Sequence, residues 1–454
     1  MSLKNKILSH LKYTPTPDQE NLVYALERFT FSNKKKPVLI VNGYAGTGKT
    51  SSVAAYVKTM VSIDIQTVLL APTGRAAKVF SSFAGKKAST IHKHIYMRLV
   101  QLDGSVQWTR TVNKKKNTVF IVDEASMIAC HKSISDKGFG FRSLLDDLLE
   151  FIFEKKGNRL ILVGDLAQLP PVGESESLAL SPEYISGLGF FTLARVSLKN
   201  VVRQEMNSGI LTNATDIRYL IDTQQAGFPK INIDSFKDIQ AISGLELEEK
   251  LETAYDKVGI EKMVFVTWSN KRANLFNGQI RQRILWMDEP LNAGDRIMVV
   301  KNNYFWLEND FIANGEILVI NKVLRQTKRF GFKFADLSVS LIENDTVTEL
   351  EVKVLMDVLM EDGPALSAEK QNLLFTRIEE DYSHIKSRTK RFKEIYNDPW
   401  FNALQIKFGY AVTAHKSQGG QWPVVFLEAP YLREPIPTIE DLRWLYTGFT
   451  RASE

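Results

Sequence analysis

The stretch Gly43-Tyr44-Ala45-Gly46-Thr47-Gly48-Lys49-Thr50 decides the fold of this chain. It follows the apolar run Val38-Leu39-Ile40-Val41, so it predicts a buried strand, a glycine-rich loop and the start of a helix. In such a loop the backbone N–H groups turn toward phosphate groups, Lys49 reaches the β- and γ-phosphate oxygens, and the Thr50 hydroxyl ligates Mg²⁺. The pattern therefore predicts a nucleoside triphosphate site in an α/β domain.

Three further apolar runs extend this pattern toward residue 215. They lie at residues 68–71, 119–122 and 160–163, and each ends in a polar cluster. Alternation of such runs with helical segments is typical of a parallel sheet whose functional loops share one edge. We therefore expect the first 215 residues to form one α/β domain.

Polar residues with hydrolytic chemistry follow two of these runs. Asp123 is expected to hold Mg²⁺ through water, and Glu124 to orient or deprotonate the attacking water. Without a phosphate loop, the same acidic pair would serve equally well as a helix cap. The third run leads into Gly164-Asp165-Leu166-Ala167-Gln168, where Gln168 is placed to contact the γ-phosphate or the lytic water. The combination predicts hydrolysis rather than binding alone.

The rest of the chain predicts a second, interrupted sheet. Its candidate strands are the apolar runs at 263–266, 411–412 and 424–427. Between them, residues 312–357 alternate as in a small barrel, and residues 366–397 have the pattern of charged helices. The predicted domains are residues 1–215 with a hairpin insertion at about 92–117, residues 216–305 with 398–454, and an insertion at 306–397 that holds the barrel and the helical segment.

Composition is that of a globular protein suited to a polyanionic partner. The 454 residues carry a formal net charge of +6, and basic runs lie at 34–36, 114–116 and 386–393. Such runs also occur as plain solvated loops. Cys130 is the only cysteine, which excludes an internal disulfide and a thiolate metal cluster. No apolar stretch reaches the ~18 residues of a membrane span, and the first residues lack a signal core. We expect a cytoplasmic protein without membrane contact.

In order and setting, the phosphate loop, the Asp123-Glu124 pair and the Gln168 loop resemble the motifs of superfamily 1 helicases. The chain most resembles the RecD-like branch, which includes the exodeoxyribonuclease V alpha subunit and small 5′-to-3′ helicases. The resemblance implies two RecA-like P-loop domains, with a small β-hairpin insertion in the first and an SH3-like β-barrel insertion in the second. It also implies ATP and Mg²⁺ as ligands, single-stranded DNA and single-strand/duplex junctions as partners, action as a monomer, and roles in DNA repair and recombination.

Other motifs of the branch add residues to the nucleotide site. Gln19, in Thr16-Pro17-Asp18-Gln19, matches the position that meets adenine. Arg203 and Arg451 match two arginines that reach the γ-phosphate from opposite sides of a cleft. Gln421 stands toward the ribose, where relatives often carry Glu. The predicted catalytic residues are Lys49, Glu124, Gln168, Arg203 and Arg451. The predicted nucleotide-binding residues are Gln19, Gly43, Ala45, Gly46, Thr47, Gly48, Lys49, Thr50, Arg203, Gln421 and Arg451, with Thr50 and Asp123 on the metal.

Three more motifs, at residues 71–78, 89–92 and 412–422, imply a track for single-stranded DNA. Short polar and basic side chains suit contacts to backbone phosphates that do not read sequence. The predicted DNA-binding residues are Thr73, Thr90, His92, Thr413, His415 and Lys416.

Aromatic residues and the hairpin extend this prediction. Phe83, Trp108 and Trp422 are candidates for stacking on bases, although aromatic residues beside apolar runs are more often core. The hairpin lies where relatives carry a strand-separating pin, with Trp108 or Leu102 as the candidate wedge.

The leading interpretation is an ATP-dependent DNA helicase that translocates 5′ to 3′, a direction implied only by the resemblance. An RNA or mixed-substrate helicase stays open as an alternative, because backbone contacts do not exclude RNA. A regulatory GTPase is disfavoured, since Asn270-Lys271-Arg272-Ala273 has Ala where guanine recognition needs Asp. A catalytically silent DNA-binding scaffold is disfavoured because every expected catalytic residue is present.

Overall fold

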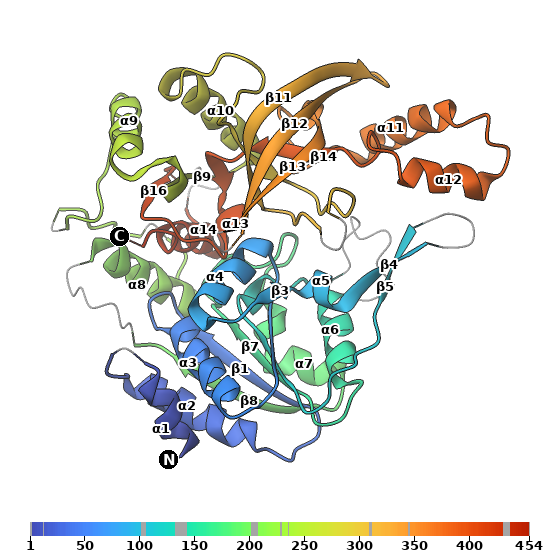
Figure 1. The fold of residues 1–454 in the computed structure, drawn as a ribbon. Helices are drawn as coiled ribbons and strands as arrows, with labels where there is room; N and C mark the ends of the chain where they lie inside the picture. Colours follow the sequence, from blue (N-terminus) through green and yellow to red (C-terminus); the bar gives the residue numbers. More distant parts are fainter. Residues whose placement is uncertain are drawn as a thin grey trace.

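A computed structural model describes residues 2–11, 13–100, 106–131, 143–200, 208–227, 229–234, 236–307, 311–343, 346–429 and 436–453. The first domain, in the lower half of Figure 1, is built on a six-stranded sheet whose described strand pairs are all parallel. This confirms the predicted parallel sheet. The strands in spatial order are β3 (Ala88–Thr90), β2 (Thr67–Ala71), β6 (Val119–Val122), β7 (Arg159–Gly164), β1 (Pro37–Gly43) and β8 (Thr192–Leu198).

Alternate residues of β1 face two different cores. Leu39 and Val41 pack with α1 (Leu3–Ser9), α2 (Pro17–Thr30), α3 (Lys49–Ser62) and α4 (Gly74–Ala84). Val38 and Ile40 pack with α5 (Ile91–Ile95), α6 (Leu144–Phe153) and α7 (Pro182–Leu188). All residues of β1 are buried, as expected of a strand covered on both faces. The phosphate loop therefore leaves a strand that packing holds on both sides.

The second domain has a three-stranded parallel sheet, in the predicted place. Its order is β15 (Ala411–Thr413), β9 (Met263–Thr267) and β16 (Val424–Leu427). α14 (Ile439–Phe449) packs against α8 (Gly209–Asp222). The remaining helices of this domain are α9 (Leu247–Val258), α10 (Asn270–Gln279), the π-helix Ile280–Ile284 and α13 (Ala414–Ser417). Single 3₁₀ turns lie at Ala125–Met127, Leu178–Leu180, Ile260–Lys262 and Met356–Val358.

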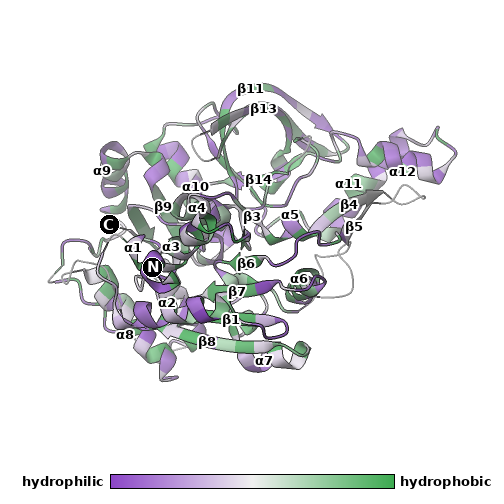
Figure 2. Cartoon of the chain, turned by 60° about the horizontal axis from the view of Figure 1, so that its bottom comes forward, coloured by the Kyte–Doolittle hydropathy of each residue, from purple (hydrophilic) through white to green (hydrophobic). Residues whose placement is uncertain are grey.

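A closed five-stranded barrel grows out of the second domain and is seen as a ring in Figure 2. Its strands are β10 (Arg296–Val299), β11 (Ile317–Arg329), β12 (Phe332–Glu343), β13 (Thr346–Leu355) and β14 (Leu404–Phe408). The barrel therefore extends beyond the predicted insertion at 306–397. Its first strand, β10, precedes that range and its last strand, β14, follows it, and both are needed to close the barrel. β10 and β14 are short, so the alternation of apolar and polar residues along them is too brief to predict a strand.

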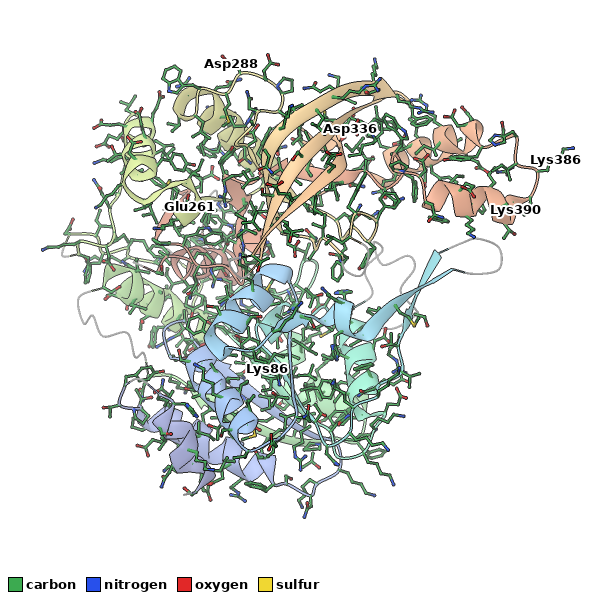
Figure 3. All side chains as sticks on the ribbon, viewed as in Figure 1. Lys86, Glu261, Asp288, Asp336, Lys386 and Lys390 are labelled. Carbon is green, nitrogen blue, oxygen red and sulfur yellow. The ribbon has the colours of Figure 1, made fainter. Side chains whose placement is uncertain are left out.

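Two helices form an arm on the barrel, as the charged pattern at 366–397 predicted. They are α11 (Ala368–Asp381) and α12 (Arg388–Tyr396), and the arm extends to the right in Figure 1. Figure 3 shows Lys386 and Lys390 near its far end. The hairpin of the first domain lies below this arm.

The hairpin itself is confirmed, as β4 (Tyr96–Val100) paired antiparallel with β5 (Val106–Arg110). Its base is fixed to α6, because the Tyr96 hydroxyl donates to Asp147 over 2.5 Å and Arg110 forms ion pairs with Glu150 and Glu154. Leu102 and the side chain of Trp108, the two candidate wedges, lie outside what the structure describes.

Candidate nucleotide site and nucleic-acid track

The phosphate loop has the backbone shape that its glycines allow. Gly46 and Gly48 both have φ of 76°, a conformation that L side chains rarely adopt. A Cβ atom on Gly48 would also lie 2.4 Å from the Gln19 amide nitrogen. On Gly43 a Cβ would lie 2.9 Å from the Lys49 side chain. The backbone conformation and close packing of the loop therefore explain these glycines even without a bound ligand.

Two predicted nucleotide-binding side chains brace this loop from within. Lys49 Nζ donates to the Tyr44 carbonyl over 2.8 Å. Gln19 is fully buried, and its amide nitrogen donates to the Thr47 carbonyl over 3.1 Å. A capping box at the start of α2 fixes Gln19, with Thr16 as the N-cap. Gln19 thus lies behind the loop, and its contact with adenine stays a prediction.

The two predicted metal ligands lie together. The Thr50 hydroxyl donates to an Asp123 carboxylate oxygen over 3.1 Å, while the other oxygen accepts the Glu124 N–H. Burial, followed by the charge of Glu124, raises the pKa of Asp123 to about 6. A cation beside Asp123 would lower this pKa again, because an opposite charge favours the ionised carboxylate. The hydroxyl and carboxylate oxygens are also the ligand type that Mg²⁺ prefers, so this pair fits the metal.

Glu124 has a φ of 53°, an uncommon value for a residue other than glycine. Strained backbone of this kind concentrates at functional sites, where the surrounding structure enforces it. The half-buried Glu124 side chain lines the same cleft as Lys49 and Thr50. This position is compatible with the predicted role in orienting water.

Gln168 and Arg451 reach the cleft from its two sides. Gln168 is 4% exposed, and its Oε1 has no hydrogen-bond partner among the described residues. An unpaired buried polar atom is costly, so a ligand or water is expected beside it. Arg451, also 4% exposed, donates to the carbonyls of Thr447 and Gly420. Burial lowers its pKa, while Glu124 acts in the opposite sense.

These residues share one interdomain cleft of about 950 Å³. Predicted residues on its lining are Ala45, Gly46, Gly48, Lys49, Thr50, Asp123, Glu124, Gln168, Gln421 and Arg451. The lining also includes Tyr13, Ala76, Val79 and Phe83, which sequence analysis did not assign to nucleotide. Arg203 lies outside the described residues. The described part of the chain contains no group of three or more His, Cys, Asp or Glu suited to a metal.

The predicted DNA contacts in the first domain lie at helix starts. Thr73 is the N-cap of α4 and accepts the Ala76 N–H, and Thr90 is the N-cap of α5 and accepts the Lys93 N–H. The His92 ring lies 5.8 Å from that of Tyr96. The local sequence explains both threonines as caps, and the N-terminus of a helix also attracts phosphate. DNA binding by Thr73, Thr90 and His92 stays a prediction.

The motif at 412–422 gives a mixed result. Thr413 is buried. Burial lowers the pKa of His415, while Glu440 and the backbone of Pro170 in the first domain act in the opposite sense. Lys416 Nζ is buried and finds no hydrogen-bond partner among the described residues. Burial, with a contribution from Lys407, lowers the pKa of Lys416 to about 8. His415 therefore faces the domain boundary, whereas Lys416 has an ammonium group still to be paired.

Trp422, a candidate for base stacking, is instead 7% exposed and packs in the core of the second domain. The Arg75 guanidinium lies 4.5 Å from its ring centre. Phe83 lines the nucleotide cleft and is 44% exposed. The alternative assignment of aromatic residues to the core is thus correct for Trp422.

Comparisons with known proteins find helicase-type domains and relatives. The family model described as AAA domain matches residues 17–219, and that described as UvrD-like helicase C-terminal domain matches residues 408–454. The ATP-dependent DNA helicase dda of Enterobacteria phage T4 is 24% identical over 92% of this chain and 93% of its own. The ATP-dependent RecD2 DNA helicase of Deinococcus radiodurans is 28% identical over 92% of this chain and 46% of its own.

An uncharacterized protein of Acanthamoeba polyphaga mimivirus is 23% identical over 91% of this chain and 93% of its own. A crystal structure of the Pif1 helicase from Bacteroides, in complex with ADP-AlF3 and single-stranded DNA, aligns with a TM-score of 0.47 at 14% identity. The alignment covers 98% of this chain and 91% of that one.

A phosphate loop and its acidic partner in one RecA-like domain face Arg451, which directly follows a helix of a second domain. This combination defines a P-loop ATPase of the helicase type. The order of the motifs and the relatives place it more narrowly. The chain is an ATP-dependent DNA helicase, and it is similar to the RecD-like branch of superfamily 1. No helix among the described residues has the length and apolarity to cross a bilayer.

Proposed function

We propose that the chain hydrolyses Mg-ATP between its two RecA-like domains and uses the resulting motion to travel 5′ to 3′ along single-stranded DNA and separate duplex. One observation carries the proposal. Lys49, the Thr50–Asp123 pair and the unpaired Gln168 share a cleft with Arg451 of the second domain. Hydrolysis is therefore positioned to change how the two domains contact each other.

The residues that line the cleft have different roles in the proposed hydrolysis. Lys49 and Arg451 stabilise charge on the transferring phosphoryl group from opposite sides of the cleft. Glu124 orients the attacking water and takes its proton, and Gln168 contacts that water or the γ-phosphate. Thr50 and Asp123 would hold Mg²⁺, which would neutralise charge on the phosphates.

Names of relatives support the nucleic-acid part of the proposal. Two are described as ATP-dependent DNA helicases, and one compared structure contains single-stranded DNA. The net charge of +6 suits such a polyanion. We propose single-stranded DNA and single-strand/duplex junctions as partners, a monomer as the working unit, and the cytoplasm as the compartment.

The test combines ATP hydrolysis, with and without single-stranded DNA, and strand displacement on duplexes that carry a 5′ or a 3′ tail. Stimulated turnover with displacement of the 5′-tailed substrate alone is the expected result. Displacement from a 3′ tail would reverse the proposed polarity. The same duplexes with an RNA loading strand distinguish an RNA or mixed-substrate helicase, and absence of DNA stimulation would remove the proposed track.

A further inference from the structure

The Tyr446 hydroxyl joins the two domains at the phosphate loop. It accepts the Ala45 backbone N–H over 2.9 Å and donates to an Asp165 carboxylate oxygen over 2.8 Å. Tyr446 belongs to α14 of the second domain, whereas Ala45 and Asp165 follow strands β1 and β7 of the first. Tyr446 is 1% exposed and Asp165 is fully buried. One side chain thus uses both its donor and its acceptor across the domain boundary.

Asp165 carries this connection to the loop that holds Gln168. Its second carboxylate oxygen accepts the Ala167 N–H over 3.0 Å. A parallel link lies beside it, since the Thr447 hydroxyl accepts the Leu169 N–H over 3.0 Å. The hydrogen bonds from α14 therefore bracket Gln168 in the sequence. Gln168 Oε1 itself remains unpaired among the described residues, so nothing in this network competes with a ligand for it.

We propose that Tyr446 is a positioning residue for ATP hydrolysis, which fixes the phosphate loop and the Gln168 loop in one register when the second domain closes. This role rests on the proposed function, because Tyr446 would act on the same nucleotide site. The Tyr446 hydroxyl acts as donor and acceptor at once, so it fixes the Ala45 N–H and the Asp165 carboxylate relative to α14. Opening of the cleft breaks both bonds together and leaves a buried carboxylate with one partner fewer.

The hydroxyl is best removed by Tyr446→Phe, which keeps the ring and its packing. The chain offers a closely matched control in the barrel region. The Tyr410 hydroxyl accepts the Arg296 N–H over 3.0 Å and donates to Asp295 over 2.9 Å, and Tyr410 is 2% exposed. Tyr410→Phe also removes one accepted and one donated hydrogen bond, but Tyr410 does not line the nucleotide cleft. Comparison of the two variants separates an effect on protein stability from an effect on the position of the phosphate loop and the Gln168 loop.

We expect Tyr446→Phe to lower kcat for DNA-stimulated ATP hydrolysis at least about tenfold, with KM for ATP within about threefold, since the misplaced groups act mainly in the transition state. Tyr410→Phe should stay within about twofold of the parent in both constants, although chemical denaturation should show a similar loss of stability. Binding gives a second measurement. Affinity for ADP should be retained in Tyr446→Phe, while affinity for ADP with aluminium fluoride should fall at least about tenfold.

Equal kcat in Tyr446→Phe and Tyr410→Phe would overturn the proposal, as would a higher KM with unchanged kcat. If Tyr446→Phe does not fold, Thr447→Val removes the neighbouring acceptor of the Leu169 N–H and should lower kcat in the same sense; unchanged kcat there would also overturn it. Failure of the proposed function is distinct, because the parent protein itself would then show no ATP turnover.

Discussion

Lys49 braces the phosphate loop and also lines the cleft in which we propose that ATP binds. Its ammonium group holds the Tyr44 carbonyl at 2.8 Å and lines the cleft. We expect Lys49→Ala to lower ATP turnover at least about a hundredfold, because the transferring phosphoryl group would lose a stabilising cation. Single-strand affinity should stay within about tenfold, since phosphate contacts elsewhere supply it. Exposed Lys58, on the same helix α3, gives the control variant Lys58→Ala. Loss of DNA binding in Lys49→Ala alone would contradict separate sites.

We expect Lys416 to make DNA binding depend on pH. Its pKa is lowered to about 8 by burial, so the ammonium form is retained below that pH and lost above it. If Lys416 meets a DNA phosphate, affinity should fall about five- to tenfold between about pH 7 and about pH 9. Fluorescence anisotropy with a single-stranded oligonucleotide measures this. The decline should be much smaller in Lys416→Met, and an equally steep decline there would assign the titration to another group.

Single residues also show what sequence analysis can and cannot recover. The Thr50–Asp123 pair was predictable because each residue belongs to a motif with fixed local spacing. The Tyr446–Asp165 bond was not predicted, since its members lie 281 positions apart and neither type signals the other. Thr73 and Thr90 illustrate a third case, in which a motif match coincides with an ordinary helix cap.

Among the elements, the hairpin is the one whose role is easiest to isolate. Tyr96 and Arg110 are paired at its base, so residues 97–109 can be replaced by an Asn-Gly turn. Both base contacts to α6 would remain. We expect ATP hydrolysis within about twofold of the parent and strand displacement lowered at least about tenfold, because neither β4 nor β5 lines the nucleotide cleft. Retained displacement would exclude the hairpin as the pin.

Element boundaries were predictable where packing on both faces left a continuous apolar run, as in β1 and β9. The barrel was less accessible. Its central strands alternate over ten or more residues, but β10 and β14 have only four and five. Their place in the barrel depends on pairing with each other across more than a hundred residues of chain, which no local pattern records.

At the scale of the whole molecule, the structure brings the two domains together through several contacts. Tyr446 contacts the phosphate loop, the Gln418 amide donates to the Leu169 carbonyl over 2.7 Å, and Lys78 donates to the Ile342 carbonyl of the barrel over 2.8 Å. Each hydrogen bond crosses from one RecA-like domain to the other or to its barrel. A cycle of ATP binding and release must therefore act on a boundary that is already hydrogen-bonded.

Interdomain movement can be measured because the native cysteine is shielded. Cys130 is 4% exposed, and burial raises the pKa of its thiol to about 12, so it reacts slowly with maleimide dyes. Exposed positions on α3 and α9 accept the variants Lys58→Cys and Glu252→Cys. Energy transfer between dyes at these sites should rise when single-stranded DNA and a non-hydrolysable ATP analogue are added together, since closure brings the domains nearer.

The same labelled pair tests what holds the boundary before nucleotide binds. With Tyr446→Phe in the labelled protein, the distribution of transfer efficiencies without ligand should broaden toward lower values, because two interdomain hydrogen bonds are gone. Tyr410→Phe should leave that distribution unchanged, since its bonds lie within one domain. If neither the ligands nor Tyr446→Phe changes the distribution of transfer efficiencies, the two domains move as one body. Translocation would then depend on motion of the barrel or the hairpin.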